Sequence, residues 1–393
     1  MKNKIKSLVS DHLERIIAIR RHLHAHPELS FEEYKTSEYV KSILSELRVG
    51  YRDGLATGTG IVAEIGQGDR VVALRADMDA LPITEQNEVP YKSQNAGVMH
   101  ACGHDVHTSS LLGCIMVLKE IEHELDVTVR CIFQPGEERL PGGASMMIAD
   151  GVFEGPKVSQ IIGQHVHPSL PSGTVGIRPD YFMASCDELF ISVIGKGGHG
   201  ALPHETIDPI LISAELIQSL QSIISRRSNP NTPSVLTIGK INSVGGATNV
   251  IPERVDMQGT FRTFDEGWRK EAHVLIAQRT QQLVEAHDAT VEIQIKKGYP
   301  SLYNHPKLTA LVKNQMIEYL GREHVIDLPP RMTAEDFSYY SQVVPACFYR
   351  LGTASKDGHF ASPVHTPTFD IDQHIIIIFN ILATEFNGFR IIL

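Results

Sequence analysis

The sequence has few cysteines, no long apolar run and no excess of positive charge, and each of these absences excludes a class of protein. Five cysteines among 393 residues, an odd and widely scattered number, do not form a disulfide framework like that of small secreted domains. No apolar run approaches the roughly 20 residues that cross a bilayer, and the tempting run Ile375–Phe379 is far too short. Residues 1–21 lack a continuous apolar stretch and are expected to be neither signal peptide nor anchor. We therefore expect a cytoplasmic protein that does not bind membranes.

Net charge and chain length exclude further classes of protein. Lys and Arg number 36 against 46 Asp and Glu, which gives a net charge of -10, and no basic run is long enough to form a nucleic-acid surface. We therefore expect no nucleic-acid partner. Hydrophobic residues make up 42% of the chain and charged residues 21%, as in a globular protein, but 393 residues are too many for one ordinary core. Two domains are predicted.

Apolar periodicity predicts that helices and strands alternate in the first 183 residues and again after residue 297. Residues 70–76 are apolar enough to form an interior parallel strand. Other strands are predicted at residues 60–65, 127–133, 160–166 and 346–351, and helices at 5–23, 32–47, 111–121, 142–149, 308–320 and 373–386.

The pattern changes in the middle of the chain. The predicted order there is strand 188–195, helix 208–226, strands 234–241 and 254–263, helix 268–287 and strand 290–296, which is the βαββαβ order of a ferredoxin-like unit. We therefore expect an α/β protein. Its catalytic domain, with a mixed, largely parallel sheet flanked by helices, covers residues 1–183 and 298–393, and the ferredoxin-like domain is inserted at 184–297.

Three predicted strands each end in a pair of side chains that can bind a metal ion. The pairs are Asp77 and Asp79, Glu137 and Glu138, and His165 and His167. Open α/β sheets bind ligands at the carboxyl ends of their strands, so this recurrence favours a metal site over three unrelated polar turns. Two adjacent carboxylates repel each other unless a cation shares the site. We expect Glu138 to bind the ion while Glu137 takes a proton from water, as metal-assisted hydrolysis requires.

A second signal is the tripeptide Cys102-Gly103-His104, which precedes the apolar segment 111–121. An extended backbone would point both side chains toward one ion, and Asp105 is expected to cap the following helix. The helix dipole and a nearby cation would lower the pKa of Cys102 and favour the thiolate. The competing interpretation is a half-buried cysteine beside surface histidines.

In the ordered set of its motifs the chain resembles the aminoacylase/carboxypeptidase family of co-catalytic metallopeptidases. Within that family it is similar to the amidohydrolase branch of hippurate hydrolases, N-acetyldiaminopimelate deacetylases, N-acyl-amino-acid amidohydrolases and auxin-conjugate hydrolases. The motifs are RHLHAHPELS at 21–30, RADMDALP at 75–82, HACGHD at 100–105, FQPGEE at 133–138, GKGGHGALP at 195–203, NVIP at 249–252, EDF at 335–337, and His365.

This resemblance implies a site with two divalent metal ions per subunit. Zinc is the expected metal, and manganese, cobalt and nickel are chemically allowed. The implied metal ligands are Cys102, His104, Glu138, His165 and His365. Glu137 is implied as general base and Asp79 as the acid that orients a ligand. His199 is implied to reach a neighbouring active site and polarise the scissile carbonyl, while Asn249 and Arg262 hold the substrate carboxylate. Without the resemblance, turn chemistry remains the competing interpretation for His199 and Asn249.

The implied activity is hydrolysis of the amide bond of N-acyl-L-amino acids, with N-acetyl, benzoyl or similar acyl groups, to a carboxylic acid and a free amino acid. The resemblance also implies that the inserted domain makes a homodimer, and such dimers could pair into a tetramer. Three alternatives stay open. They are a carboxypeptidase or dipeptidase that cleaves short peptides, a cysteine amidase with Cys102 as nucleophile, and a binding protein with a structural metal.

Overall fold

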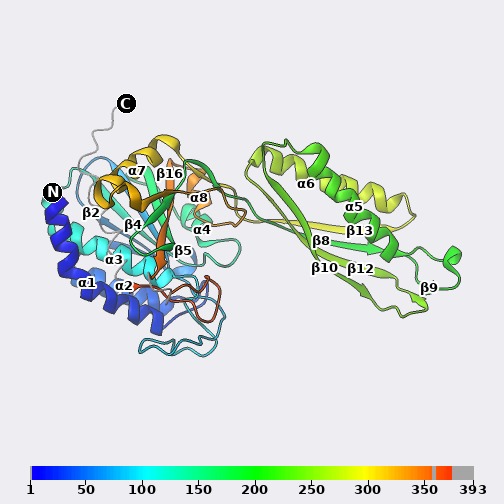
Figure 1. Ribbon diagram of the computed structural model, residues 1–393, viewed down its shortest axis with the longest axis horizontal. Coiled ribbons are helices and arrows are strands. Elements are labelled where there is room, and N and C mark those ends of the chain that lie inside the picture. Colours follow the sequence, from blue (N-terminus) through cyan, green and yellow to red (C-terminus); the bar gives the residue numbers. More distant parts are fainter. Residues whose placement is uncertain (1, 356–359, 374–393) are drawn as a thin grey trace. The chain divides into compact units, whose positions relative to one another are not determined.

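The computed structural model describes residues 2–355 and 360–373, so all of the predicted helix 373–386 beyond its first residue lies outside the described residues. The chain forms two compact units, shown in Figure 1. The first unit comprises Met1–Phe182, Tyr303–Pro329 and Asp336–Leu393, and the second comprises Met183–Leu302 and Pro330–Glu335. The second unit is therefore an insertion in the chain of the first.

The first unit is built on an eight-stranded sheet with the order β1-β2-β4-β3-β5-β16-β6-β15. Its strands are β1 (Tyr51–Leu55), β2 (Gly60–Ile65), β3 (Val71–Asp77), β4 (Thr128–Gln134), β5 (Val158–Pro171), β6 (Val175–Ile177), β15 (Val325–Asp327) and β16 (Ala346–Ala354). The pairs β3–β4, β3–β5, β5–β16 and β6–β15 are parallel, and the other pairs are antiparallel. The predicted mixed, largely parallel sheet is confirmed.

The strand register brings the carboxyl ends of the central strands to one edge of the sheet. Asp77, the last residue of β3, pairs with Gln134 at the end of β4. On the other side of β3, Arg75 pairs with Gly163 of β5, so Asp77 lies level with His165 two residues later. The three polar strand ends that the sequence singled out therefore meet at the same edge.

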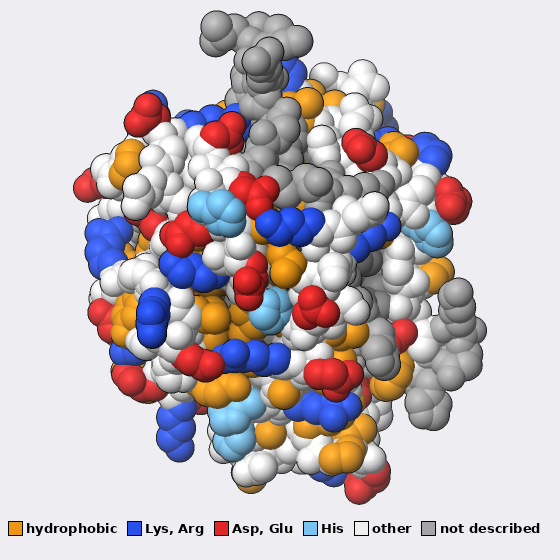
Figure 2. All heavy atoms as spheres, turned by 90° about the vertical axis from the view of Figure 1, so that its left-hand side faces the viewer, with side chains coloured by type: hydrophobic (Ala, Val, Ile, Leu, Met, Phe, Trp, Pro, Cys, Tyr) orange, Lys and Arg blue, Asp and Glu red, His pale blue; other side chains and the backbone are white. Residues whose placement is uncertain are grey.

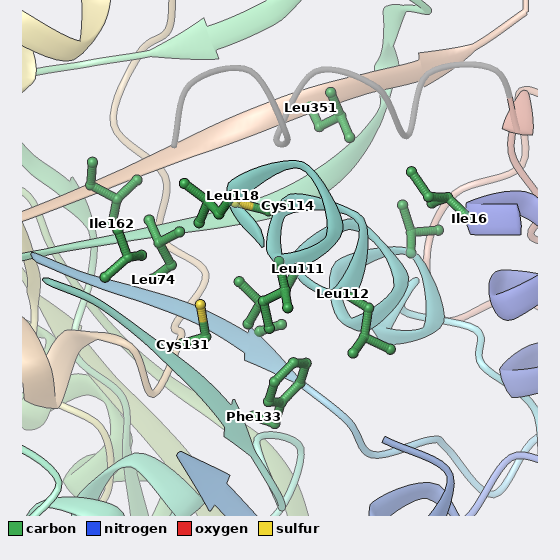
Figure 3. Close-up of a cluster of buried hydrophobic side chains, with 14 of the residues drawn as sticks. Ile16, Leu74, Leu111, Leu112, Cys114, Leu118, Cys131, Phe133, Ile162 and Leu351 are labelled. Atoms are coloured by element: carbon green, nitrogen blue, oxygen red, sulfur yellow. The ribbon is translucent and has the colours of Figure 1, made fainter. Parts of the chain in front are cut away.

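Helix α3 (His104–Glu120) packs its side chains against this sheet, as Figure 3 shows. Its residues from His104 to Leu118 are all buried, because Ile16 and other side chains of α1 (Lys2–Ala25) contribute to the same core as the sheet. A helix buried on all sides can be apolar all round, which explains its weak amphipathicity. Each fully buried aliphatic side chain contributes about 1.5–3 kcal/mol. Among the described residues of the first unit, the other helical segments are α2 (Tyr34–Glu46), α4 (Gly143–Ala149), α7 (Pro306–Leu320), α8 (Ser338–Ser341) and the short 3-10 turns Ala56–Gly58, Glu122–Glu124 and Arg322–His324.

The second unit has a four-stranded antiparallel sheet with the order β10-β12-β8-β13. Its elements are β8 (Asp187–Ile194), α5 (Pro209–Arg227), β10 (Ser234–Val244), β12 (Arg254–Thr263), α6 (Glu266–Glu285) and β13 (Thr290–Lys297), with the 3-10 turn Pro203–Glu205. A small sheet in this unit pairs β9 (Gly198–His199) with β11 (Val250–Ile251), while β7 (Asp180–Met183) and β14 (Leu302–Asn304), most of whose residues belong to the first unit, form another. The βαββαβ order confirms the predicted ferredoxin-like topology.

The first and last strands of this unit are tied together at one end. Asp187 begins β8 and pairs in register with Lys297, the last residue of β13. The Asp187 carboxylate accepts hydrogen bonds from Arg269 of α6 and from the Gly298 backbone N–H, while Arg269 also donates to the Gly298 carbonyl. Arg269 and Asp187 are both buried, so their opposite charges satisfy one another.

On the face of the molecule shown in Figure 2, acidic and basic side chains are interspersed, which is the pattern of an ordinary hydrated surface. Within residues 2–355 and 360–373, no helix is long and apolar enough to span a bilayer.

Candidate metal centre

The five predicted ligands come from four segments of the first unit. Cys102 and His104 flank Gly103, whose φ of +81° turns the chain into α3. A Cβ atom at position 103 would lie 2.7 Å from the side chain of Val166, so the turn requires glycine. The backbone N–H of His365 donates to the carbonyl of Ala101 at 2.7 Å, which brings the last ligand beside Cys102. The predicted extended backbone at Cys102-Gly103-His104 is wrong, because a left-handed turn performs its role.

The structure brings the five side chains together. The Cys102 Sγ atom lies 3.3 Å from Nε2 of His165 and 3.3 Å from Nε2 of His365. The same His365 nitrogen lies 3.1 Å from Oε1 of Glu138. The ligand atoms of Cys102, His104 and His165 all lie within 4.8 Å of one another, as do those of Cys102, Glu138 and His365. These two triads share Cys102.

The chemistry of these residues fits a pair of divalent ions. His104 directs Nδ1 to Asp79 Oδ1 at 3.1 Å, whereas its Nε2 is buried without a hydrogen-bond partner among the described residues. Asp77 Oδ2 lies 3.7 Å from this nitrogen, too far for a hydrogen bond. A buried polar atom without a hydrogen bond costs about 1–3 kcal/mol, which a bound ion would offset. One thiol, three imidazoles and one carboxylate form a donor set that suits zinc and related transition metals.

The protein's own groups do not favour the Cys102 thiolate. Burial raises the pKa of the Cys102 thiol well above its ordinary value, and the nearby carboxylates of Glu138 and Glu137 raise it further. These side chains act against the expected lowering of the Cys102 pKa by the helix dipole and a nearby cation, which stays a prediction that depends on a bound ion. Burial opposes the charged form of His104, but Asp77 and Asp79 outweigh it and raise its pKa to about 10. A metal ion would have to displace protons from both ligands.

Asp79 connects the ligands to one another. Its Oδ2 accepts hydrogen bonds from the Ser30 hydroxyl at 2.6 Å and from the Glu138 backbone N–H at 3.0 Å, and its Oδ1 faces His104. Burial opposes ionisation, but the hydrogen bond and charge of His104, together with Ser30, hold the pKa of Asp79 below its usual range. An ionised Asp79 keeps the His104 proton on Nδ1, which leaves Nε2 available to an ion.

Glu137 lies beside the ligands in a tightly held turn. It is 6% exposed, and its carboxylate belongs to a third group of atoms, with His104 and Glu138, that lie within 4.8 Å of one another. Its Oε1 accepts a long hydrogen bond of 3.4 Å from the Asp336 backbone N–H. The Asp336 side chain in turn accepts from Arg75 at 2.7 Å and from the Ala144 N–H at 2.9 Å.

Arg75 is a residue that the sequence interpretation did not assign. It is fully buried and donates to Asp77 at 2.6 Å as well as to Asp336. An arginine inside an otherwise apolar predicted strand was the available signal, because a buried charge needs a charged partner. Asp77 also accepts from His107 at 2.5 Å, and His107 Nε2 accepts from the Val166 backbone N–H at 3.0 Å. Both His107 nitrogens are therefore used within the protein.

The predicted capping role of Asp105 is wrong. Helix α3 begins at His104 with Gly103 as its N-cap, so Asp105 lies in the first turn. Its carboxylate instead pairs with Arg20 at 2.8 Å and with His24 at 2.8 Å, both from α1. This buried ion pair fixes α1 to the start of α3 and thereby supports the ligand-bearing turn.

The three predicted substrate-contacting residues lie in the second unit. His199 and Asn249 are neighbours, because β9 pairs with β11 and the Gly200 N–H donates to the Asn249 carbonyl at 2.8 Å. The Ala201 N–H donates to His199 Nδ1 at 3.0 Å, so the exposed ring carries its proton on Nε2 and can donate there. The chain reaches His199 and Asn249 from the end of the four-stranded sheet that contains Ile194 and Arg254. Arg262 lies at the other end of that sheet, where it donates to the Met332 carbonyl at 3.0 Å.

Comparison with known proteins adds independent support. The model of peptidase family M20/M25/M40 matches residues 73–384. N-acetyl-L-cysteine deacetylase of Bacillus subtilis is 41% identical over 367 residues, which are 93% of this chain and 85% of that protein. Thermostable carboxypeptidase 1 of Saccharolobus solfataricus is 37% identical over 394 residues, 98% of each chain. A Bacillus subtilis crystal structure described as a dinuclear metal-binding peptidase from the M20 family matches with a TM-score of 0.81 and 32% identity, over 98% of this chain and 99% of that one. Given a family match over most of its length and relatives of this similarity, the chain belongs to peptidase family M20/M25/M40 and is a hydrolase of amide C–N bonds.

Proposed function

We propose that this protein is a metal-dependent amidohydrolase that cleaves N-acyl-L-amino acids to a carboxylic acid and a free amino acid. The observation that carries the proposal is the convergence of two ligand triads on Cys102 with Glu137 beside them. The similarity to an N-acetyl-L-cysteine deacetylase supports the substrate class. Cys102, His104 and His165 would hold one divalent ion, and Cys102, Glu138 and His365 the other, with zinc as the expected metal.

Bound ions of this kind polarise an amide carbonyl and lower the pKa of water. Glu137 then supplies the general base: its carboxylate accepts one proton from the attacking water and later gives that proton to the nitrogen of the leaving amino acid. The bond between the carbonyl carbon and the water oxygen forms first, and the C–N bond breaks when the nitrogen accepts the proton from Glu137, so water is the only other reactant needed. Asp79 keeps His104 oriented, and the Asp336 N–H holds Glu137 in place.

His199 is the proposed donor to the carbonyl oxygen, where negative charge develops. Its Nδ1 is already used by Ala201, so Nε2–H is the atom that donates. A donor of this kind is worth about 3 kcal/mol of barrier. We propose that His199 acts in the site of a second copy of the chain, within a homodimer. We also propose that Asn249 and Arg262 hold the substrate carboxylate, and because they lie at opposite ends of the sheet, each site would take them from different copies.

A metallo-carboxypeptidase is the second candidate, and the 37% identity with a thermostable carboxypeptidase favours it. Both candidates share the same hydrolytic chemistry and differ only in the group on the carbonyl side of the cleaved bond. We also propose a cytoplasmic location, which the free thiol state of all five cysteines supports.

One experiment tests the function and its rivals together. The purified protein, with its metal content measured, is assayed for free amino acid released from N-acetyl and N-benzoyl amino acids and from dipeptides. We expect the N-acyl substrates to be cleaved with the highest kcat/KM, activity to be lost after chelation, and activity to return when ions are restored. Preference for dipeptides would favour the carboxypeptidase, and full activity after complete removal of metal would favour a Cys102 nucleophile.

A further inference from the structure

The loop that joins α1 to α2 contacts both turns that carry the candidate metal centre. Leu29 forms a bridge with Ala80, and Ser30 donates to Asp79 in the turn after β3. Glu33 reaches the other turn, after β4, where Glu137 and Glu138 stand. This loop, residues 26–33, overlaps the motif at residues 21–30. Apart from Ser30, which contacts Asp79, its residues have no role in the proposed chemistry.

Glu33 is fully buried, and both of its carboxylate oxygens are occupied. Oε1 accepts the backbone N–H of Gly136 at 2.8 Å and that of Phe31 at 2.9 Å. Oε2 accepts the Thr59 hydroxyl at 3.0 Å. A side chain fixed at both oxygens cannot follow a moving partner, so it holds the Gly136 peptide in one position.

The Phe31 ring closes the same turn from a second direction. Gly136 has a φ of +61°, and a Cβ atom built on it would lie 2.2 Å from Cε1 of Phe31. Phe31 itself has a φ of +68°, a left-handed conformation that is rare for an aromatic residue. The loop therefore accepts backbone strain at the residue that packs against the turn. On the far side of the turn, the Gly136 carbonyl accepts from the Gly143 N–H at 3.0 Å.

We propose that Glu33 is a positioning residue for hydrolysis, which holds the Gly136 peptide and thereby sets the direction of the Glu137 carboxylate. The inference rests on the proposed function, because it takes Glu137 as the general base. Glu33 would act through the hydrogen bonds that its carboxylate oxygens accept, and not through its negative charge. Glutamine at this position can still accept from Gly136 and Phe31 through its carbonyl oxygen, and its amide can donate to the Thr59 hydroxyl.

The test compares variants of the whole, metal-loaded enzyme. We expect Glu33→Ala to lower kcat by about 10- to 100-fold, because a general base displaced by an ångström loses that much rate. KM and the metal content should change little, because the Glu138 backbone N–H stays held by Asp79 and the other ligands lie outside this turn. Glu33→Gln should restore kcat to near the wild-type value.

Glu28 provides a matched control in the same loop. Its carboxylate also accepts two backbone N–H groups, those of Lys35 and Thr36, but these belong to the start of α2 and not to the Gly136 turn. Glu28→Ala should lower the melting temperature and leave kcat unchanged. A merely structural role for Glu33 would give the same pattern as Glu28.

The outcomes separate this inference from the proposed function. A Glu33→Ala enzyme with normal kcat, or a Glu33→Gln enzyme as slow as Glu33→Ala, overturns the positioning role. If Glu33→Ala does not fold, Glu33→Asp takes its place, since its shorter side chain keeps a carboxylate but draws it away from the Gly136 N–H. That variant must then lower kcat, and a normal kcat overturns the inference. A Glu137→Gln enzyme with normal turnover would instead show that the proposed function is wrong.

Discussion

Replacing Asp79 by asparagine is the sharpest test of how the centre is held together. The carboxylate accepts from Ser30 and from the Glu138 N–H through Oδ2 and faces His104 through Oδ1, and it is 1% exposed. An asparagine has one acceptor oxygen and one donor group. If the oxygen stays with Ser30 and Glu138, the amide faces His104 and forces its proton onto Nε2, the atom needed by the metal.

The other orientation of the asparagine fails in a different way. Its oxygen then faces His104, but its amide opposes the buried N–H of Glu138 and leaves it unpaired. Either orientation removes one supporting interaction from a metal ligand. Loss of such a partner costs about 10- to 100-fold in metal affinity. This corresponds to ~1.4 to ~2.8 kcal/mol of binding free energy.

The assay is calorimetric titration of the chelator-treated protein with Zn²⁺ or Mn²⁺, with metal content measured after dialysis. Ser30→Ala is the control, because it deletes one donor to Asp79 and leaves the carboxylate facing His104. We expect the control to lose less affinity than Asp79→Asn. If Asp79→Asn binds both ions as tightly as the wild type, the His104 tautomer does not depend on Asp79 and the reasoning is refuted.

Three further predictions follow from other parts of the structure. Glu137→Gln should keep both ions and lower kcat by at least 100-fold, about the size of a general-base contribution, and unchanged turnover in a steady-state assay would contradict its role. His199→Ala should keep fold and metal content but lower kcat by about 100-fold, and normal kinetics with an N-acetyl amino acid would exclude it as a donor. Burial opposes ionisation of Asp187, but Arg269 and His273 hold its pKa below the usual value of 3.8. Its contribution to stability is therefore complete above that pH and lost as the pH falls below it, so melting curves between pH 2 and 6 should show a smaller acid loss for Asp187→Asn than for the wild type.

Regular elements with strong patterns could be predicted from the sequence, and short ones could not. The predicted strands 60–65 and 254–263 coincide with β2 and β12, because apolar or alternating side chains cover their full length. Strands β6 and β15 have three residues each, too few for any periodicity, and were not predicted. Their pairing depends on neighbours that are distant in the sequence.

The same limit applies within the candidate centre. Residue type and position in the sequence pointed to Cys102, His104, Glu138 and His165, and the family resemblance implied His365 and the grouping of all five, which the structure brings together. The environment of Cys102 could not be predicted, because Glu137 and Glu138 approach it only after folding. Likewise Asp105 is a residue type that often caps helices, but its partner Arg20 lies 85 positions earlier in the chain. Such long-range pairings decide what a polar residue does, and no local pattern reports them.

The tie between Asp187, Arg269 and Gly298 has a consequence for the origin of this architecture. The first and last residues of the ferredoxin-like segment, Asp187 and Gly298, are neighbours. The segment can therefore be inserted, lost or replaced without a change in the backbone of the first unit. A fragment of residues 187–298 should accordingly unfold in one cooperative transition. Replacing these residues by a short linker should leave the fold of the first unit unchanged. Evolution can thus exchange the inserted unit without altering the fold of the hydrolytic half, but the proposed contributions of His199, Asn249 and Arg262 would be lost with it.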